Sequence, residues 1–419
     1  MRIVIAPDSF KGSMTAQEFC DAAERGIRKV LPEAEIVKMP IADGGEGTMY
    51  CMMSVLGGKV DELSVTSAFL GEKRTVRVGF ADSGKTAIIE SAEAMGLPSV
   101  GERKNPALTT TFGVGEMIKY ALEQGAVKIV LTLGGSSTND CGAGMMAALG
   151  AKFYGADGKS FVPTGGTLGE VVSCDFSALN ERLSGTEVVA MCDVNNPLCG
   201  ENGCSAVYAP QKGADAAMVA LLDSGCRHFA DVVAACNAKK GVSAQDFSEF
   251  PGAGAAGGLG FACVSCMHGT LKSGIDTILG LYGFMAAAGE ADYVITGEGR
   301  FDAQSLMGKT VGGVVAKTRE AAAAFKRGKI PVVVFCGKNA VSGDVAAGGN
   351  AVTKAVTAAA SDTDSLAVTY PELSIHEISA GQELSYAMSH ATKNLERETA
   401  SWAQQIATGH GAVPDVTEA

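Results

Sequence analysis

The chain has 419 residues, of which 47% are hydrophobic and 19% charged, and its formal net charge is −12. This is enough apolar material for two or three domains with substantial cores, and too much for a disordered chain. The negative charge argues against a protein whose main partner is nucleic acid or an anionic membrane surface, because both are negatively charged. A small phosphate-bearing ligand needs only a few local donors and is not excluded.

Targeting and redox signals are weak. The first residues, MRIVIAPDSFKGS, contain no long apolar segment and no small-residue cleavage site, so we expect no secretory signal. No apolar run approaches the ~20 residues that span a bilayer. The 12 cysteines are scattered, and the close pair Cys263 and Cys266 has neither a second pair nor paired histidines to complete a zinc site. We therefore expect free, mostly buried thiols in a cytoplasmic protein.

The first 56 residues alternate between strand and helix. Arg2–Ala6 is apolar and predicts a strand, and Thr15 with Glu18 forms a capping box that predicts the start of a helix. Glu35–Ala42 predicts a second strand, and Met49–Leu56 a second helix. This β-α-β-α order is typical of a parallel α/β sheet.

Residues 57–100 have a different, hairpin-like pattern. Lys59–Val65, Arg74–Phe80 and Thr86–Glu90 are predicted strands separated by turn residues. Gly79–Thr86 matches the phosphate-binding pattern G-x-x-x-x-G-K-T letter for letter. That motif requires a helix after its lysine, whereas a strand is predicted here, and Asp82 would bring negative charge into the cradle. We interpret the segment as a hairpin turn.

The rest of the chain returns to alternating strands and helices. The predicted elements are a helix at Thr111–Gln124, a strand at Lys128–Leu133, a helix at Met145–Leu149, a strand at Glu187–Asp193, helices at 213–240 and Leu259–Met267, a strand at Tyr293–Thr296, a helix at Thr310–Ala324, strands at Ile330–Phe335 and Ala351–Ala358, and one amphipathic helix at Gly381–Thr408. We predict an α/β fold of two domains. A Rossmann- or flavodoxin-like parallel-sheet domain is formed by residues 1–65 and 287–419, and residues 66–286 form an inserted α/β domain with antiparallel elements.

Four predicted loops after strands combine glycines with acidic and hydroxyl residues. They are Asp8–Ser13, Asp43–Thr48, Gly134–Gly144 and Gly297–Asp302. Such loops gather beyond the carboxyl ends of the strands in an open α/β sheet, where ligands bind. Glycine exposes backbone N–H groups to anions, hydroxyl and amide side chains donate to phosphate, and carboxylates hold Mg²⁺ or accept a proton from an alcohol. These groups suit phosphoryl transfer.

Three further segments carry candidate chemistry. Cys192–Pro197 places Asp193 at the end of a predicted strand, and Pro210–Ala214 offers Lys212 beside a glycine. Gly252–Gly257 matches G-x-G-x-x-G, but the preceding residues Ser248–Pro251 do not predict the strand that a dinucleotide site needs. A nicotinamide-dependent dehydrogenase is therefore a weaker alternative.

Taken together, the motifs resemble those of the bacterial type I glycerate kinases over nearly the whole chain. The resemblance rests, in chain order, on Ala6–Gly12, Ala42–Thr48, Gly134–Asp140, Cys192–Leu198, Pro210–Gly213, Gly252–Gly260, and Thr296–Gly299 with Asp302, Gly308 and Lys309. There are two departures. Cys141 stands where a small residue is expected, and the segment after about residue 385 is longer than the family pattern.

The resemblance implies ATP-dependent phosphorylation of D-glycerate with Mg²⁺, giving 2-phosphoglycerate and ADP in glycerate, glyoxylate or aldarate breakdown. A 3-phosphate product stays an alternative, because both hydroxyls belong to one three-carbon acid. The expected partners are D-glycerate and ATP, with neither nucleic acid nor membrane, and a homodimer is the assembly considered. A non-catalytic nucleotide or metabolite sensor is the alternative from another class, since it would need glycine-rich loops without the repeated Asp and Lys.

Residue chemistry suggests a role for each candidate. Asp43 or Asp193 would accept a proton from the attacking hydroxyl or align it, and Lys11 would neutralise charge during transfer. The predicted substrate-binding residues are Asp8, Ser9, Gly44, Gly45 and Lys212. The predicted nucleotide-binding residues are Gly134, Gly135, Ser136, Thr138, Asn139, Gly254, Gly257, Gly297 and Glu298. The predicted Mg²⁺ contacts are Asp140, Glu298 and Asp302.

Overall fold

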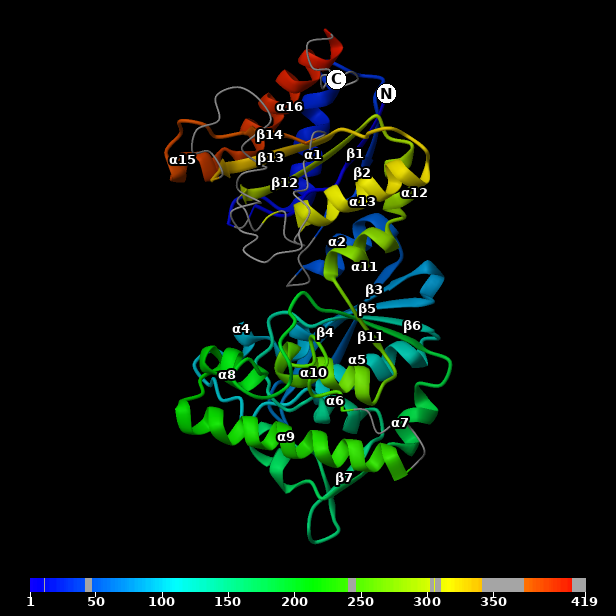
Figure 1. Cartoon of the computed structure of the whole chain (residues 1–419), viewed down its shortest axis with the longest axis vertical. Helices are drawn as coiled ribbons and strands as arrows, with labels where there is room; N and C mark the ends of the chain where they lie inside the picture. The colour runs from blue at the N-terminus through cyan, green and yellow to red at the C-terminus, as the bar shows by residue number, and fades with distance from the viewer. Residues whose placement is uncertain are drawn as a thin grey trace, which may run out of the picture. The chain divides into compact units, whose positions relative to one another are not determined.

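The computed structural model describes residues 1–10, 12–41, 47–239, 246–301, 305, 310–340 and 373–408. The chain divides into two compact units, and Figure 1 colours it from the N-terminus to the C-terminus. Unit 1 comprises Met1–Asp43 and Ile275–Ala419, and unit 2 comprises Gly44–Gly274. None of the described helices combines the length and the apolar content needed to span a bilayer.

Unit 1 contains a sheet of five parallel strands in the order β14-β13-β12-β1-β2. They are β1 (Arg2–Ile5), β2 (Glu35–Lys38), β12 (Tyr293–Phe301), β13 (Val332–Asn339) and β14 (Leu373–Glu377). Because β1 lies between β2 and β12, the sheet is assembled from two distant segments of the chain. This parallel sheet, with the second unit between its two segments, confirms the predicted α/β fold class.

The strands of unit 1 differ from the prediction at several points. β2 ends at Lys38, before Pro40, which has no N–H to donate to a neighbouring strand. Gly297–Asp302 was predicted as a loop, and this was wrong through Phe301, because β12 continues and pairs with β13 beyond Gly297. Strand β14 was not predicted. The predicted strand Ala351–Ala358 lies outside the described residues.

Helices cover both faces of this sheet. On one face, α1 (Ala16–Arg28) and α16 (Ala391–Ala407) pack with Ile3, Ile5 and Phe335. Figure 1 shows these two helices, blue and red, side by side. The other helices that the structure describes in unit 1 are α11 (Gly274–Leu281), whose first residue belongs to unit 2, α12 (Phe284–Gly289), α13 (Thr310–Ala324), which contacts β12 and β13, and α15 (Leu384–Ser389).

Of the helices predicted in unit 1, the start of α1 is confirmed and the C-terminal helix is not. The capping box that predicts the start of α1 is present: Glu18 N donates to Thr15 Oγ1 at 3.1 Å, and Thr15 N donates to Glu18 Oε2 at 2.8 Å. The single helix predicted for Gly381–Thr408 was wrong, because α15 and α16 are separated at His390. At this break, the carbonyl of Tyr386 accepts hydrogen bonds from His390 N at 3.1 Å and from Ser389 Oγ at 3.0 Å.

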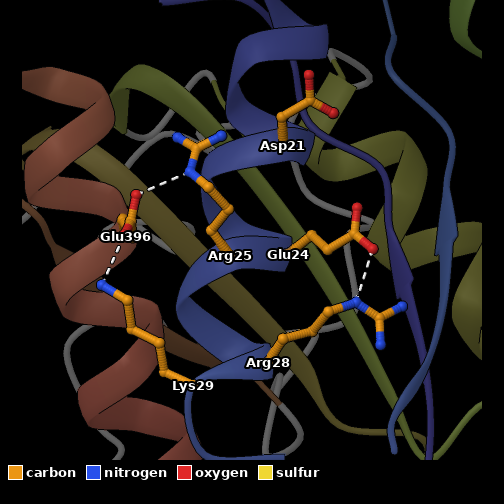
Figure 2. A pocket seen from close by; sticks show the side chains of 6 residues that line it. All are labelled: Asp21, Glu24, Arg25, Arg28, Lys29 and Glu396. Atoms are coloured by element: carbon orange, nitrogen blue, oxygen red, sulfur yellow. Dashed lines mark hydrogen bonds and ion pairs between the residues drawn. The ribbon is translucent and has the colours of Figure 1, made fainter. Parts of the chain in front are cut away.

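A hollow beside α1 and α16 is lined only by charged side chains (Figure 2). Glu396 pairs with Arg25 at 2.9 Å and with Lys29 at 2.6 Å, and Arg28 pairs with Glu24 at 2.8 Å. The hydrogen bonds from Lys29 and Arg25 lower the pKa of Glu396. Each cation drawn in Figure 2 already has a carboxylate partner. We therefore do not take this hollow as a ligand site.

Gly26 lies where α1 packs tightly against α16. A Cβ at this position would lie 2.1 Å from Thr399 Oγ1 and 2.3 Å from the carbonyl oxygen of Glu396. We expect Gly26→Ala to lower the free energy of unfolding by about 1–3 kcal/mol, because the two helices must move apart. Thermal unfolding of the full chain measures the effect.

Gly280→Ala is the matched control, because Gly280 is also a helical glycine of unit 1 and a Cβ there would meet nothing within 4 Å. The control is expected to be neutral or to stabilise by up to about 1 kcal/mol, since alanine has the higher helix propensity. Equal effects of the two substitutions would contradict the close packing of α16 on α1.

Unit 2 contains a six-stranded mixed sheet in the order β11-β10-β6-β5-β4-β3. Its strands are β3 (Lys59–Thr66), β4 (Lys73–Ala81), β5 (Thr86–Glu90), β6 (Lys128–Thr132), β10 (Glu187–Met191) and β11 (Thr270–Lys272). Strands β3, β4 and β5 pair antiparallel, and β5 also belongs to the parallel part, which continues through β6, β10 and β11. A short 3₁₀ turn, η1 (Asp82–Gly84), joins β4 to β5, which confirms that Gly79–Thr86 is a hairpin turn.

A second, antiparallel sheet of unit 2 has the order β8-β7-β9, with β7 (Lys152–Tyr154), β8 (Ser160–Phe161) and β9 (Ser173–Asp175). The helices and 3₁₀ turns of unit 2 are α2 (Thr48–Leu56), α3 (Ser91–Met95), α4 (Leu97–Val100), α5 (Phe112–Glu123), α6 (Ala143–Ala148), η2 (Gly165–Glu170), α7 (Ser177–Arg182), α8 (Cys204–Tyr208), η3 (Pro210–Lys212), α9 (Ala216–Lys239) and α10 (Ala255–Ser265). The long α9 is prominent in Figure 1.

The compact units and the predicted domains have different bounds. The predicted domain boundaries lie after residues 65 and 286, whereas the units divide after Asp43 and Gly274. Strand β3 explains the first difference, because it pairs along its whole length with β4 and so belongs to the sheet of unit 2.

Candidate functional site

Three sequence motifs meet beyond the carboxyl ends of β6 and β10 in unit 2. Residues 133–142 follow β6, residues 192–198 follow β10, and residues 252–258 contact both. Cys141 N donates to the carbonyl of Gly257 at 3.0 Å, and Gly254 N donates to the carbonyl of Asn196 at 3.0 Å. The structure therefore brings these motifs together at the edge of the sheet where open α/β folds bind ligands.

Two of the predicted nucleotide-binding glycines allow these loops to pack against each other. Gly257 has φ +68°, and a Cβ there would lie 2.0 Å from the carbonyl oxygen of Thr138. A Cβ on Gly254 would lie 2.3 Å from the carbonyl oxygen of Pro197. Both glycines are needed for loop–loop contact, whatever they contribute to a ligand.

The loop after β6 exposes its glycines and buries most of its side chains. Gly135 is exposed and Gly134 half-buried, whereas Ser136 is 8% exposed and Thr138 and Asn139 are fully buried. Asn139 Nδ2 donates to Ser205 Oγ at 3.0 Å, inside the unit. Of the five predicted phosphate contacts in this loop, Gly134, Gly135 and Ser136 are therefore the ones that keep some exposed surface.

Asp140, predicted as a Mg²⁺ contact, is fully buried and holds the backbone of its own unit. Its carboxylate accepts hydrogen bonds from Thr111 N at 2.8 Å, Thr111 Oγ1 at 2.9 Å, Gly142 N at 3.1 Å and Gly144 N at 3.2 Å. Burial raises the pKa of Asp140, although these donors oppose the shift. With its oxygens engaged by four donors, Asp140 does not fit a metal ligand.

Lys212, predicted to bind substrate, is only 2% exposed. Its ammonium donates to the carbonyl oxygen of Thr138 at 2.6 Å and to Ser136 Oγ at 3.0 Å. Burial lowers the pKa of Lys212 to about 8. Lys212 thus supports the loop after β6 from inside the unit.

Two carboxylates at this edge of the sheet bind the first amides of helices. Asp193, after β10, is exposed, and its Oδ1 accepts from Gly274 N, the first residue of α11, at 2.8 Å. Glu90, the last residue of β5, is 2% exposed and accepts from Met49 N at 2.6 Å and Gly47 N at 3.3 Å. Glu90 is not among the predicted site residues, although an acidic residue at the end of an apolar strand is a usable signal.

The carboxyl end of the sheet in unit 1 holds a second group of predicted residues. Asp8 Oδ1 accepts from Ser9 N at 2.6 Å, and Asp8 Oδ2 accepts from Thr310 Oγ1 at 2.9 Å. Asp8 N donates to the carbonyl of Gly297 at 2.8 Å, next to the half-buried Glu298. The fold therefore brings Asp8, Ser9, Gly297 and Glu298 together.

Gly297 has a packing role in addition to any role with nucleotide. A Cβ there would lie 2.3 Å from the carbonyl oxygen of Phe335 and 2.6 Å from the ring of Phe19. Lys11, Asp43, Gly44, Gly45 and Asp302 lie outside the described residues, and their predicted roles stay predictions. Among the residues that are described, no cluster of three His, Cys, Asp or Glu side chains could hold a metal ion.

The remaining motifs have structural explanations. Turns, rather than a strand, precede G-x-G-x-x-G, which counts against a dinucleotide site. The 12 cysteines are free and most are buried, as predicted. Cys263 lies within α10, and burial raises its pKa to about 12.

Comparisons with known proteins point to one family. The glycerate kinase family is matched over residues 3–377. The chain is 44% identical over 338 residues to "Glycerate kinase" of Bacillus subtilis (strain 168), covering 80% of this chain and 85% of that one. It is 44% identical over 315 residues to "Glycerate 2-kinase" of Escherichia coli (strain K12), covering 75% and 81%. The crystal structure of a Salmonella typhimurium LT2 protein assigned as glycerate kinase 2 is similar, with a TM-score of 0.79, 33% identity, and coverage of 98% and 100%.

Proposed function

The chain belongs to the glycerate kinase family, and we propose that it transfers the terminal phosphoryl group of ATP to the 2-hydroxyl of D-glycerate. The products are 2-phosphoglycerate and ADP. The observation that carries the choice of the 2-hydroxyl is the identity with the Escherichia coli glycerate 2-kinase. The geometry supports a kinase, because the exposed Gly135 and Asp193 follow β6 and β10 at the carboxyl edge of one sheet, and the buried Lys212 supports the loop after β6.

In this proposal, each group of residues has one chemical task. Gly134, Gly135 and Ser136 bind phosphates of the nucleotide, and Asp8 and Ser9 bind glycerate. Asp193 accepts the proton of the attacking hydroxyl as its oxygen forms a bond to the γ-phosphorus and the bond to ADP breaks. Asp43 and Lys11 stay proposed members of the same machinery.

Mg²⁺ is the proposed companion of ATP. It supplies charge neutralisation for the phosphates when bound. Of the three predicted contacts, Asp140 does not fit, because its oxygens already accept four hydrogen bonds. Glu298 at the carboxyl end of the sheet in unit 1 fits as a carboxylate ligand, and Asp302 stays a proposal.

The finer parts of the biological setting are also proposals. They are a cytoplasmic location, a role in glycerate, glyoxylate or aldarate breakdown, and a homodimer. The alternatives are a 3-phosphate product and a sensor that binds nucleotide without turnover.

The product of the reaction tests the proposed function. Purified protein is incubated with ATP, Mg²⁺ and D-glycerate, and the product is assayed with enolase alone or with enolase and phosphoglycerate mutase. We expect signal from enolase alone, because enolase acts on 2-phosphoglycerate. Signal only after mutase is added would replace the 2-phosphate by the 3-phosphate. Binding of nucleotide without any formation of ADP would favour the sensor.

A further inference from the structure

Lys212 is a buried cation in unit 2 whose hydrogen-bond acceptors are both neutral. Its ammonium donates to Ser136 Oγ and to the carbonyl oxygen of Thr138, and the side chain is 2% exposed. Removing a lysine side chain from water costs free energy unless its positive charge interacts with a negative charge. A buried ammonium directly behind a ligand-binding loop is therefore expected to act on an anion.

Among the described residues, none of the charged or titratable groups around Lys212 accepts a hydrogen bond from its ammonium or forms an ion pair with it. Asp140 is the nearby acid, and its oxygens are engaged by Thr111, Gly142 and Gly144. Cys204 on α8 and Cys226 on α9 also face Lys212. Their pKa values are raised well above the ordinary thiol value, so both stay neutral at physiological pH.

Ser136 connects this charge to the surface. Its Oγ accepts from Lys212 Nζ at 3.0 Å, which leaves the hydroxyl hydrogen of Ser136 to be donated elsewhere. Among the described residues, this hydroxyl has no acceptor within hydrogen-bond distance. Ser136 is 8% exposed and directly follows Gly134 and Gly135, the accessible part of the loop.

We propose that Ser136 donates its hydroxyl hydrogen to a phosphate group of the bound nucleotide, and that Lys212 is a positioning residue that polarises this hydroxyl without touching the nucleotide. The inference rests on the proposed function and assigns Lys212 a different role from the substrate contact predicted from sequence. Donation from Lys212 to Ser136 Oγ strengthens the outgoing hydrogen bond, because chains of hydrogen bonds polarise one another. Glycerate carboxylate is the other anion that this loop could hold, and the test separates the two.

Binding of ADP to the full chain, measured by calorimetry with excess Mg²⁺ and without glycerate, is the first test. We expect Ser136→Ala to raise the Kd of ADP about 10- to 100-fold, the effect of losing one hydrogen bond to a charged group. Ser137→Ala is the matched control, because Ser137 Oγ is buried and donates to the carbonyl of Met95. It is expected to leave ADP affinity within about twofold of the original, whatever it does to stability.

A double-mutant cycle tests whether Lys212 acts through Ser136. Lys212→Met is expected to weaken ADP binding in the original chain and to have much less effect when Ser136 is already alanine. Equal effects in both backgrounds would overturn the connection between the two residues. A change in the KM of glycerate with unchanged ADP affinity would assign the loop to the carboxylate and overturn the phosphate assignment.

The pH dependence of ADP binding is a further test, because a lysine with a merely structural role would not change it. Because burial lowers the pKa of Lys212 to about 8, we expect ADP affinity to fall as the pH rises through 8. The stability contribution of this group changes in the opposite direction. Between pH 8 and its ordinary value of 10.5, the unfolded chain binds the extra proton, so the contribution of Lys212 to stability rises with pH.

Two comparisons decide the outcome even if Lys212→Met fails to fold. In the original chain, ADP affinity should fall above pH 8, and in Ser136→Ala this fall should be smaller. Identical pH profiles, or unchanged ADP affinity in Ser136→Ala, would overturn the inference while leaving the kinase proposal intact. Conversely, the original chain could bind ADP normally and form no phosphoglycerate, which would overturn the proposed function alone.

Discussion

Gly257→Ala is expected to lower the free energy of unfolding of the chain by about 3–5 kcal/mol, the largest stability effect that we predict. Two costs combine at this position. The residue has φ +68°, which is unfavourable for alanine, and its Cβ would lie 2.0 Å from the backbone oxygen of Thr138. Backbone cannot move aside as a flexible side chain can. Thermal unfolding monitored by circular dichroism measures the loss.

Gly185→Ala separates these two costs. Gly185 has φ +76° and lies in the same unit, but a Cβ there would meet nothing within 4 Å. The control should therefore show only the backbone cost of about 1–2 kcal/mol. If both substitutions destabilise the chain equally, the contact between residues 252–258 and the loop after β6 is not as tight as described.

Asp193→Asn is expected to lower kcat by about 10²- to 10⁴-fold, the contribution of a general base, with little change in melting temperature. The amide oxygen of asparagine can still accept the hydrogen bond from Gly274 N, which Asp193 Oδ1 accepts at 2.8 Å. Asparagine cannot accept a proton from the attacking hydroxyl. Steady-state kinetics with ATP and D-glycerate, together with thermal unfolding, measure both effects.

Asp215 provides the matched control in unit 2. It is also exposed, and its Oδ1 accepts from Met218 N at 2.8 Å in the first turn of α9. Asp215→Asn is expected to leave kcat unchanged. Near-normal kcat in Asp193→Asn, combined with a lower melting temperature in Asp193→Ala, would limit Asp193 to holding the start of α11.

The secondary structure could be predicted where its cause is local. The helix expected at Thr111–Gln124 is α5, Phe112–Glu123, and the strand expected at Lys128–Leu133 is β6, Lys128–Thr132. Hydrophobic periodicity and turn residues act over a few residues, so the sequence pattern contains the necessary information. The break between α15 and α16 at His390, by contrast, has no counterpart in the hydrophobic periodicity.

The candidate site could be predicted only in part, because long-range contacts decide which way its side chains point. Motif spacing places Ser136 and Asn139 in a loop after a strand, and both are there. Lys212, 76 residues away from Ser136, donates a hydrogen bond to the Oγ of Ser136, and no local sequence pattern predicts this pairing. For the same reason, Gly257 matches a dinucleotide motif, although a glycine is needed at this position for close contact with Thr138.

The strand order of unit 1 has a consequence for synthesis of the chain on the ribosome. β1 pairs with β12, and Arg2 and Asp292, at the start of these strands, are 290 residues apart. At about 5–20 residues per second, β12 emerges roughly 15–60 s after β1. All of unit 2 is translated in this interval and contains the strands that its own sheets need. One edge of β1 therefore stays unpaired, and able to pair with a wrong strand, until the second segment of unit 1 has been synthesised.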